Sequence, residues 1–319
     1  MHIIITGANG FVGRALAVRL QGNGHLGTRR IERLTLLDTM FEAPATAGFV
    51  RQQLGNIAEA SVVSAAFEPE VDVVFHLASV PGGTAEQHYE LGRDVNLHGT
   101  TLLLEHAKAQ VERGSQAPVF VFASTIAVFG SPMPPLVDDD TPLAPQMTYG
   151  AQKVIGEVLV ADFSRRGWVD GRSVRLPGVL ARPPARTGQL SAFMSDLIRE
   201  LGAGRPFTCP TSPEATTWAS SLPNIIDNLI HAASVDAATL EGRRSYTLPT
   251  QRFSFGELVE AIAEVHGPAI REQVSWAPDE RTERLFGRFP SLRTPAAEAV
   301  GFRRDADLAT LVRRAVEVA

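Results

Sequence analysis

The chain has 319 residues, of which 44% are hydrophobic, so it is long enough to bury a large core in one α/β unit or in two linked domains. Its net charge is −5, and its arginines and glutamates are scattered, which argues against a nucleic-acid-binding stripe or a polybasic membrane patch. A single cysteine, Cys209, excludes an internal disulfide, and without clustered histidines it predicts no metal site.

We expect a cytoplasmic protein whose partners are small molecules rather than nucleic acid or membrane. The first residues lack the charged segment and apolar run of an export signal. No stretch of the sequence is long and apolar enough to span a bilayer.

Short apolar runs alternate with longer amphipathic stretches through the first half of the chain. The apolar runs of the first half predict strands at Ile3–Thr6, Leu34–Asp38, Val71–Ala78 and Val119–Ser124. Two later runs predict strands at Ser173–Leu176 and Tyr246–Leu248. The amphipathic stretches predict helices at Phe11–Leu20, Ala58–Phe67, Asn96–Ala109, Thr148–Arg165, Gln189–Leu201, Phe255–His266 and Asp305–Val318. This order predicts an α/β fold with a doubly wound parallel sheet of the Rossmann type, in which ligands bind at the carboxyl ends of the strands.

A glycine-rich turn follows the first predicted strand and leads directly into a helix. The first glycine of Gly7-x-x-Gly10-x-x-Gly13 permits a tight turn, the second lets the backbone approach a pyrophosphate, and the third lets helix and strand pack closely. The N-terminus of the helix then faces the phosphates. We therefore expect dinucleotide contacts from Gly7, Asn9, Gly10, Phe11, Val12 and Gly13.

Asp38 ends the second predicted strand, where a carboxylate can accept hydrogen bonds from both hydroxyls of an adenosine ribose. The same carboxylate would repel a 2′-phosphate. The residues just after it, Thr39, Met40 and Phe41, include no arginine to bind such a phosphate. The pattern favours NAD over NADP, and the alternative is a surface aspartate that merely ends a strand.

Residues after the later strands are expected at the same edge of the sheet. Asn56 is a candidate for contact with adenine and is equally plausible as a helix cap. Asn96 either holds backbone or water near the active site or caps the helix that it opens. His76 is interpreted as a packed, hydrogen-bonded core histidine. The other expected cofactor contacts at strand ends are Ile57, Leu77, Ala78, Ser79, Leu176, Gly178 and Val179.

Tyr149 and Lys153 lie at positions i and i+4 of a predicted helix and therefore project from one face. With three tyrosines and two lysines in the chain, such a pair arises by chance with a probability of roughly one in fifty. A phenol with a pKa near ~10 is a poor base at neutral pH, but an adjacent ammonium group lowers that pKa. Tyr149 can then take a hydroxyl proton while hydride leaves the carbon, and both residues are also expected to contact the cofactor.

Thr125 ends the strand before this helix and offers a hydroxyl group to the same substrate oxygen. Ser124 is its immediate neighbour and a second candidate. The alternative for both is a plain role in forming a turn.

We expect substrate contacts from the strand-end loop Pro81–Thr84 and from the region after Leu176, in addition to Thr125 and Tyr149. The candidates are Gly82, Gly83, Thr84, Gly178, Arg182, Phe193, Thr216 and Trp218. Phe193 and Trp218 are alternatively packing residues.

Prolines interrupt the sequence after Leu176 and predict a change of architecture. We expect residues 1–176 with 221–249 to form an NAD-binding Rossmann domain. Residues 177–220 with 250–319 would form a smaller, mixed C-terminal cap that binds substrate, with a Pro-rich and Arg-rich connection at Trp276–Pro295.

The chain resembles the extended short-chain dehydrogenase/reductase family over essentially its whole length. The matching motifs occur in order and are Thr6–Gly13, Asp38, His76-Leu77-Ala78, Asn96-x-x-Gly99-Thr100, Ser124-Thr125-x-x-Val128-Phe129-Gly130, Asp139-x-Thr141-Pro142-x-x-Pro145 and Tyr149-Gly150-x-x-Lys153. The resemblance implies that Thr125, Tyr149 and Lys153 form the catalytic set and that Lys153 also holds the nicotinamide ribose. It further implies a homodimer formed through the Asn96 and Tyr149 helices.

Within this family the chain is most similar to the subgroup that oxidises the 2-hydroxyl group of the four-carbon sugar acid D-erythronate with NAD. The similarity includes Ala85-Glu86-Gln87, Phe163–Gly171, Val174–Pro177, Cys209-Pro210 and Trp218. The chain departs from the subgroup at two places. Arg186-Thr187 replaces Pro-Asn, and Thr216 replaces an arginine that would bind a carboxylate. Arg182 or Arg186 is the alternative cation, and a neutral ketone or keto ester is the alternative substrate.

Two other functions remain open at this point. A nucleotide-sugar epimerase or reductase would use the same Tyr/Lys chemistry, but Gly178 stands where many such enzymes have an asparagine that helps to hold the diphosphate. A redox-sensing Rossmann protein would bind dinucleotide without turnover. Such proteins usually lack the tyrosine or the lysine, and both are present here.

Overall fold

The computed structural model describes residues 1–45, 47–180, 192–240 and 242–316, which form two compact units. The described residues of Met1–Gly130, Leu143–Leu176 and Ile226–Thr247 make up the first unit, and those of Ser131–Pro142, Pro177–Ile225 and Leu248–Ala319 make up the second. The segment 131–142, which we expected in the first domain, thus belongs to the second unit. The assignment of NAD binding to one unit and of substrate binding to the other stays a prediction.

A parallel sheet of seven strands forms the centre of the first unit, in the order β13-β9-β7-β6-β1-β4-β5. In chain order the strands are β1 (His2–Thr6), β4 (Arg33–Asp38), β5 (Val50–Leu54), β6 (Val73–His76), β7 (Val119–Thr125), β9 (Asp170–Leu176) and β13 (Ser245–Thr247). The order runs outward from β1 in both directions, so the predicted doubly wound α/β fold is confirmed. Its switch point lies between β1 and β6, and this is where such folds bind ligands.

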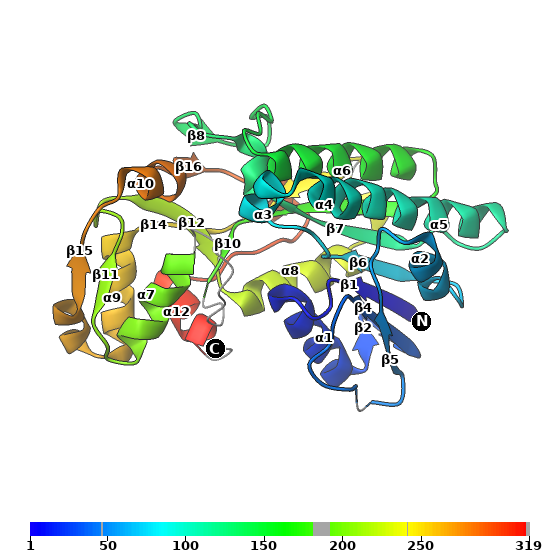
Figure 1. Cartoon of the computed structure of the whole chain (residues 1–319), viewed down its shortest axis with the longest axis horizontal. Helices are drawn as coiled ribbons and strands as arrows, with labels where there is room; N and C mark the ends of the chain where they lie inside the picture. The colour runs from blue at the N-terminus through cyan, green and yellow to red at the C-terminus, as the bar shows by residue number, and fades with distance from the viewer. Residues whose placement is uncertain (46, 181–191, 241, 317–319) are drawn as a thin grey trace. The chain divides into compact units, whose positions relative to one another are not determined.

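Helices cover both faces of this sheet, which is why all five residues of β1 are buried (Figure 1). One face carries α2 (Ala60–Ala66), α5 (Thr100–Glu112) and α6 (Thr148–Arg165), and the other carries α1 (Phe11–Asn23) and the last part of α8 (Leu222–Ser234). The shorter elements of the unit are β2 (His25–Leu26), β3 (Arg29–Arg30), α3 (Gly82–Gln87), α4 (Tyr89–Gly92), the π-helical η1 (Arg93–Gly99) and the 3₁₀ turns η2 (Ile126–Phe129) and η3 (Ala237–Leu240).

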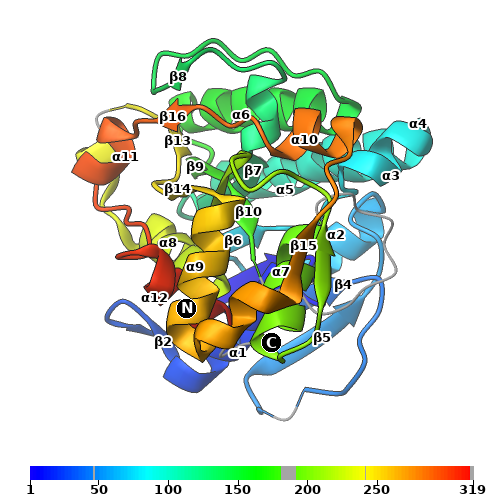
Figure 2. The same ribbon diagram turned by 90° about the vertical axis from the view of Figure 1, so that its left-hand side faces the viewer.

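The second unit is built on a three-stranded sheet in which β12 (Thr216–Ser220) lies between β10 (Gly178–Val179) and β14 (Gln251–Ser254). Three amphipathic helices, α7 (Ala192–Gly202), α9 (Phe255–His266) and α12 (Leu308–Val316), pack together and enclose its apolar core (Figure 2). The remaining elements are β8 (Leu136–Val137), β11 (Phe207–Cys209), η4 (Pro268–Gln273), β15 (Val274–Trp276), α10 (Glu280–Phe286), β16 (Ser291–Leu292) and α11 (Pro295–Ala299). No helix in the described parts of the chain is long and apolar enough to cross a membrane.

Three expected boundaries need correction, and one connection contains regular elements. The helix that we expected to open at Asn96 continues the helical turns that start at Tyr89. Gly82 begins α3, so the expected loop Pro81–Thr84 is largely helical. The connection Trp276–Pro295 contains α10 and β16. The last helix starts at Leu308 rather than at Asp305, because Asp307 accepts a hydrogen bond from the backbone nitrogen of Thr310.

Candidate active site

The turn after β1 brings the glycine motif against the end of β6. Gly7 has φ +68°, and a Cβ atom there would lie 2.7 Å from the backbone nitrogen of Ala78. A Cβ atom on Gly13 would lie 2.0 Å from the carbonyl oxygen of Gly7. Side chains at these positions would therefore collide with backbone, so Gly7 keeps the turn tight and Gly13 lets helix α1 pack closely on the strand, as a dinucleotide-binding turn requires. Helix α1 begins at Phe11, so Phe11, Val12 and Gly13 form its first turn.

Asp38 is fastened to this turn at the end of β4. Its Oδ2 atom accepts a hydrogen bond of 2.8 Å from the backbone nitrogen of Asn9, and its Oδ1 atom accepts one of 2.7 Å from the backbone nitrogen of Thr39. The carboxylate is half-buried; Oδ1 also accepts a long hydrogen bond of 3.4 Å from Thr39 Oγ1, whereas Oδ2 retains a second lone pair for a ribose hydroxyl. The structure thus brings the predicted pyrophosphate turn and the predicted ribose acceptor together.

Arg14 is a residue at this site that sequence reasoning missed. Its Nη1 atom donates to Glu42 Oε2 at 2.9 Å, and its Nη2 atom donates to both Asn9 O and Asn9 Oδ1 at 3.2 Å. The only signal in the sequence was the position of Arg14 directly after Gly13. We looked for an arginine after Asp38, whereas the fold supplies one from helix α1.

The segment after β6 passes directly under the glycine turn. The backbone nitrogen of Leu77 donates to Thr6 O at 3.2 Å, and the backbone nitrogen of Ala78 donates to Thr6 Oγ1 at 3.2 Å. His76 is fully buried, and its ring nitrogens lie 2.8 Å from Thr6 Oγ1 and Thr100 Oγ1. Burial and the nearby charge of Lys153 hold the pKa of His76 well below its usual value. The interpretation of His76 as a packed core histidine is confirmed.

Asn56 and Asn96 do not cap helices. Asn56 Oδ1 accepts from the backbone nitrogen of Ala58, and the capping position of α2 is Glu59. Asn96 lies inside the π-helical η1, where its side chain accepts from Val80 N at 2.7 Å and donates to Val80 O at 3.0 Å. It therefore holds the backbone that leads into α3. Both capping interpretations are wrong, and a contact of either residue with the cofactor stays a prediction.

Helix α6 positions Tyr149 and Lys153 beside the end of β7. The ammonium group of Lys153 is buried, donates to Ala123 O at 2.7 Å, and lies 5.6 Å from the centroid of the Tyr149 ring. Its pKa is lowered to about 7, chiefly because burial removes the charge from water, although the charge of Glu157 acts in the opposite direction. The pair is arranged as the sequence predicted.

The first turn of α6 also lies directly against the segment that follows β7. A Cβ atom on Gly150 would lie 2.6 Å from Ala127 O, two residues beyond Thr125. Thr125 is half-buried, and its Oγ1 atom accepts a hydrogen bond of 3.2 Å from the backbone nitrogen of Ala127. Ser124 instead donates its hydroxyl proton to Glu157. The structure therefore directs the two predicted hydroxyl groups to different partners.

Helix α3 carries the expected substrate residues Gly82, Gly83 and Thr84, of which Gly82 lies near Tyr149 and Gly83 borders open space. A Cβ atom on Gly82 would lie 3.0 Å from Met147 Cε and 4.0 Å from Tyr149 Cβ, whereas one on Gly83 would meet nothing within 4 Å. Thr84 is half-buried on the same helix. Glu86, further along α3, accepts a hydrogen bond of 2.8 Å from the backbone nitrogen of Thr148 and so fixes the start of α6.

The expected substrate residues of the second unit have packing roles in this structure. Trp218 is fully buried, and its indole nitrogen donates to Pro290 O at 2.8 Å. Phe193 is 8% exposed and packs on Phe255 at 5.3 Å between ring centroids. Gly178 packs closely on β12, because a Cβ atom added to it would lie 3.1 Å from Trp218 O. Arg182 and Arg186 lie outside the described residues.

Thr216 has an arginine beside it that sequence reasoning missed. Arg252 on the neighbouring strand β14 donates to Phe289 O at 3.1 Å and to Thr216 Oγ1 at 3.4 Å, and it is exposed. Thr216 itself donates to Phe289 O at 2.8 Å. A guanidinium group thus stands next to Thr216, the position at which the family resemblance implies an arginine.

Comparison with known proteins identifies close relatives of the chain. The model of the NAD-dependent epimerase/dehydratase family matches residues 3–218. A curated protein named D-erythronate dehydrogenase from Cupriavidus necator is 37% identical, with 99% of this chain and 98% of the relative covered. Another protein of that name, from Haemophilus influenzae, is 32% identical, with 99% of each chain covered.

Solved structures give a consistent result. The crystal structure of a nucleoside-diphosphate-sugar epimerase from Agrobacterium tumefaciens is 33% identical, with a TM-score of 0.93 over 99% of this chain and 94% of that chain. A GalE-like L-threonine dehydrogenase from Cupriavidus necator, solved in its holo form, has a TM-score of 0.84 over 100% of both chains. It is 22% identical and shows that the fold is shared.

Proposed function

This chain belongs to the NAD-dependent epimerase/dehydratase family, and from that premise we propose that it oxidises the 2-hydroxyl group of a small sugar acid, with D-erythronate as the leading candidate. The match to two dehydrogenases of that acid over nearly their whole length carries the proposal. The chain is an NAD-dependent oxidoreductase, and the choice of substrate is the part that needs the experiment.

The first unit holds the cofactor in this proposal. The turn from Gly7 to Gly13, which its glycines keep tight against backbone, lies against the pyrophosphate, and Asp38 accepts hydrogen bonds from the adenosine ribose. Ala78, directly beneath Gly7, forms the other wall. Lys153 holds the nicotinamide ribose, as the family resemblance implies.

The proton of the substrate hydroxyl passes to Tyr149. The ammonium group of Lys153, 5.6 Å from the centroid of the Tyr149 ring, favours the phenolate form and so assists Tyr149 as the base. Thr125 donates its hydroxyl hydrogen to the substrate oxygen and holds it in place. NAD, when bound, supplies the acceptor for the hydride that leaves the carbon bearing this hydroxyl group.

The experiment is a measurement of NADH formation with D-erythronate, L-threonate, shorter and longer hydroxy acids, and a neutral ester of each acid. A preference for D-erythronate supports the proposal, and activity only on the esters or on ketones in reverse contradicts it. Tyr149→Phe is expected to abolish turnover while changing the Kd of NADH by less than about threefold. A Tyr149→Phe protein that still oxidises substrate would contradict the role of Tyr149 as the base.

A nucleotide-sugar epimerase is the second candidate, and the 33% identity to the Agrobacterium protein favours it. Epimerases of this kind keep NAD tightly bound because the hydride returns to the same substrate. The discriminating measurement is the NAD content of the purified protein. Retained, non-exchanging NAD supports epimerisation, whereas freely exchanging NAD supports a dehydrogenase.

We also propose a homodimer that uses helices α4 and α6. Both helices expose large apolar side chains, namely Tyr89 (55% exposed), Leu91 (45%), Ile155 (45%) and Val158 (63%). Exposed apolar side chains gathered on neighbouring helices are typical of an interface between subunits. We place the protein in the cytoplasm, where an enzyme that releases NADH has a pool of NAD to draw on.

A further inference from the structure

The position of Arg14 changes the physical basis of the expected preference for NAD. Arg14 is 51% exposed and hydrogen-bonded to both the carbonyl and the side chain of Asn9, whose backbone nitrogen in turn holds Asp38. Asn9 therefore links the guanidinium group of Arg14 to the carboxylate of Asp38, which is expected to bind the adenosine ribose. The absence of arginine after Asp38 in the sequence does not by itself exclude binding of a 2′-phosphate.

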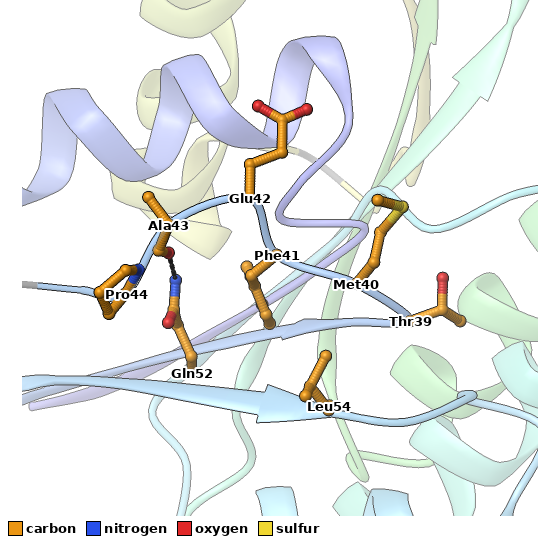
Figure 3. Close-up of a pocket in the computed structure, with 8 residues that line it drawn as sticks. All are labelled: Thr39, Met40, Phe41, Glu42, Ala43, Pro44, Gln52 and Leu54. Carbon is orange, nitrogen blue, oxygen red and sulfur yellow. Dashed lines mark hydrogen bonds between the residues drawn. The ribbon is translucent and has the colours of Figure 1, made fainter.

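Glu42 is the partner that occupies this guanidinium group. Its carboxylate is 62% exposed and lies 2.9 Å from Arg14 Nη1. Glu42 belongs to the loop after β4, whose residues 39–44 line an open surface pocket together with Gln52 and Leu54 of β5 (Figure 3). In Figure 3 the Glu42 carboxylate points away from the apolar side chains of Phe41 and Leu54.

The loop that carries Glu42 is held by Gln52 of β5 on the side that follows Glu42. The side-chain amide of Gln52 donates to Ala43 O at 2.8 Å, and its oxygen accepts from the backbone nitrogen of Ala45 at 3.1 Å. These two hydrogen bonds hold the backbone directly after Glu42. The backbone next to Glu42 is therefore attached to β5, which limits how far the carboxylate can move from Arg14.

The charges around Arg14 decide which adenosine ribose is tolerated. A 2′-phosphate carries about two negative charges and would face the carboxylates of both Asp38 and Glu42. An arginine freed from its carboxylate partner binds a phosphate with two parallel hydrogen bonds and strong charge assistance. Glu42 both occupies Arg14 and adds repulsion.

We propose that Glu42 is a specificity-determining residue: by pairing with Arg14 it prevents this guanidinium group from binding the 2′-phosphate of NADP, so that selection of NAD depends on Asp38 and Glu42 together. The inference rests on the proposed dinucleotide site and not on the identity of the substrate.

The test is direct binding of NADH and NADPH, followed by nucleotide fluorescence, so that it needs no substrate. Glu42→Gln keeps the size of the side chain and removes its charge. We expect this variant to bind NADPH about tenfold more tightly, while its Kd for NADH changes by less than about threefold. Asp38→Ser combined with Glu42→Gln should shift the ratio of the two Kd values further toward NADPH.

Two further variants separate a specific role of Arg14 from a general loss of negative charge. Arg14→Met added to Glu42→Gln should remove the gain in NADPH affinity. Glu260→Gln is the matched control, because Glu260 forms an equally exposed ion pair with Arg271 in the second unit. It should leave both Kd values unchanged.

The proposal is overturned if Glu42→Gln leaves the ratio of the two Kd values at that of the wild type, or if the gain survives Arg14→Met. Failure of the proposed function looks different. A wild-type protein that binds neither nucleotide overturns both, whereas one that binds NADH but does not oxidise D-erythronate leaves the role of Glu42 intact.

Discussion

The hydroxyl group of Ser124 donates a hydrogen bond of 2.5 Å to Glu157, a carboxylate that also accepts hydrogen bonds from Arg175 at 2.7 and 2.9 Å. Glu157 follows Lys153 by one helical turn on α6, so Tyr149, Lys153 and Glu157 share one face of the helix. This buried ion pair fixes α6 against strands β7 and β9. Ser124 therefore supports helix α6, which carries Tyr149 and Lys153, and a contact of Ser124 with substrate stays a prediction.

The first prediction compares Ser124 with its neighbour Thr125. Ser124→Ala removes one hydrogen bond to a buried carboxylate that Arg175 still holds. We expect the free energy of unfolding to fall by about 1–3 kcal/mol, with kcat within about threefold of the wild type. Thr125→Val should instead lower kcat/KM by about a hundredfold or more. Urea unfolding and steady-state kinetics measure both effects, and equal losses of activity would contradict the distinction.

The second prediction concerns the titration of Lys153. Its pKa is lowered from 10.5 to about 7, chiefly by burial, whereas the charge of Glu157 raises it. The chain has only one other lysine, Lys108, so the two side-chain signals can be followed by NMR with labelled lysine. We expect the Lys153 signal to titrate near pH 7 in the wild type. In the Glu157→Gln variant the Lys153 signal should titrate at a lower pH, because the carboxylate that raises the pKa of Lys153 is gone. A Lys153 signal that titrates near 10.5 would contradict this description of the site.

The same shift has a consequence for stability, with a definite sign. Between pH 7 and 10.5 the unfolded chain holds a proton on Lys153 that the folded protein has released, so this group makes stability rise with pH across that range. The slope is at most about 1.4 kcal/mol per pH unit. We expect Lys153→Met to remove this part of the increase when unfolding by urea is compared at pH 7 and pH 9. Parallel curves for the two proteins would exclude it.

The parts of the site that depend on local sequence could be predicted. Helix α6 has the bounds that its amphipathic pattern indicated, and Gly7 adopts the positive φ angle that its motif requires. The alternation of side chains along a strand could also have separated Ser124 from Thr125, because neighbours in a strand point to opposite faces. The alternation is visible in the sequence, but it assigns Ser124 and Thr125 to their partners only once the face of the sheet that α6 covers is known.

The parts that depend on tertiary contacts could not be predicted. Asn96 reads as a helix start because a polar residue precedes an apolar stretch, yet its amide is used by Val80, sixteen residues earlier. Arg14 reaches Glu42 across 28 positions, and Arg252 reaches Phe289 across 37. Such pairs have no fixed spacing along the chain. They follow from the order of strands in the sheet and from loops that only the folded backbone brings together.

The third prediction tests the proposed dimer. Val158 on α6 and Val18 on α1 are equally exposed, at 63% and 64%, but they lie on helices that cover opposite faces of the sheet. We expect Val158→Arg to dissociate the dimer in sedimentation experiments, because it places an unpaired charge in an apolar interface. Val18→Arg should leave the sedimentation coefficient unchanged. A Val158→Arg protein that stays dimeric would move the interface elsewhere.

The fourth prediction tests recognition of a carboxylate by Arg252. This guanidinium group is oriented by Phe289 O and Thr216, and among the described residues it has no carboxylate partner within ion-pair distance. We expect Arg252→Gln to raise the KM for D-erythronate by about tenfold or more while the Kd of NADH stays constant. Arg293→Gln, at another exposed position of the same unit, is the matched control.

A second substitution makes this prediction specific. Thr216→Arg, introduced into the Arg252→Gln protein, should restore the KM, because Thr216 and Arg252 are adjacent and an arginine at either position can reach the same ligand group. The neutral ester of the acid should show no dependence on either residue, since it lacks the charge that a guanidinium group recognises. If the KM for the acid does not respond to Arg252→Gln, the carboxylate is bound by another cation, and the replacement of arginine by Thr216 has no compensation on strand β14.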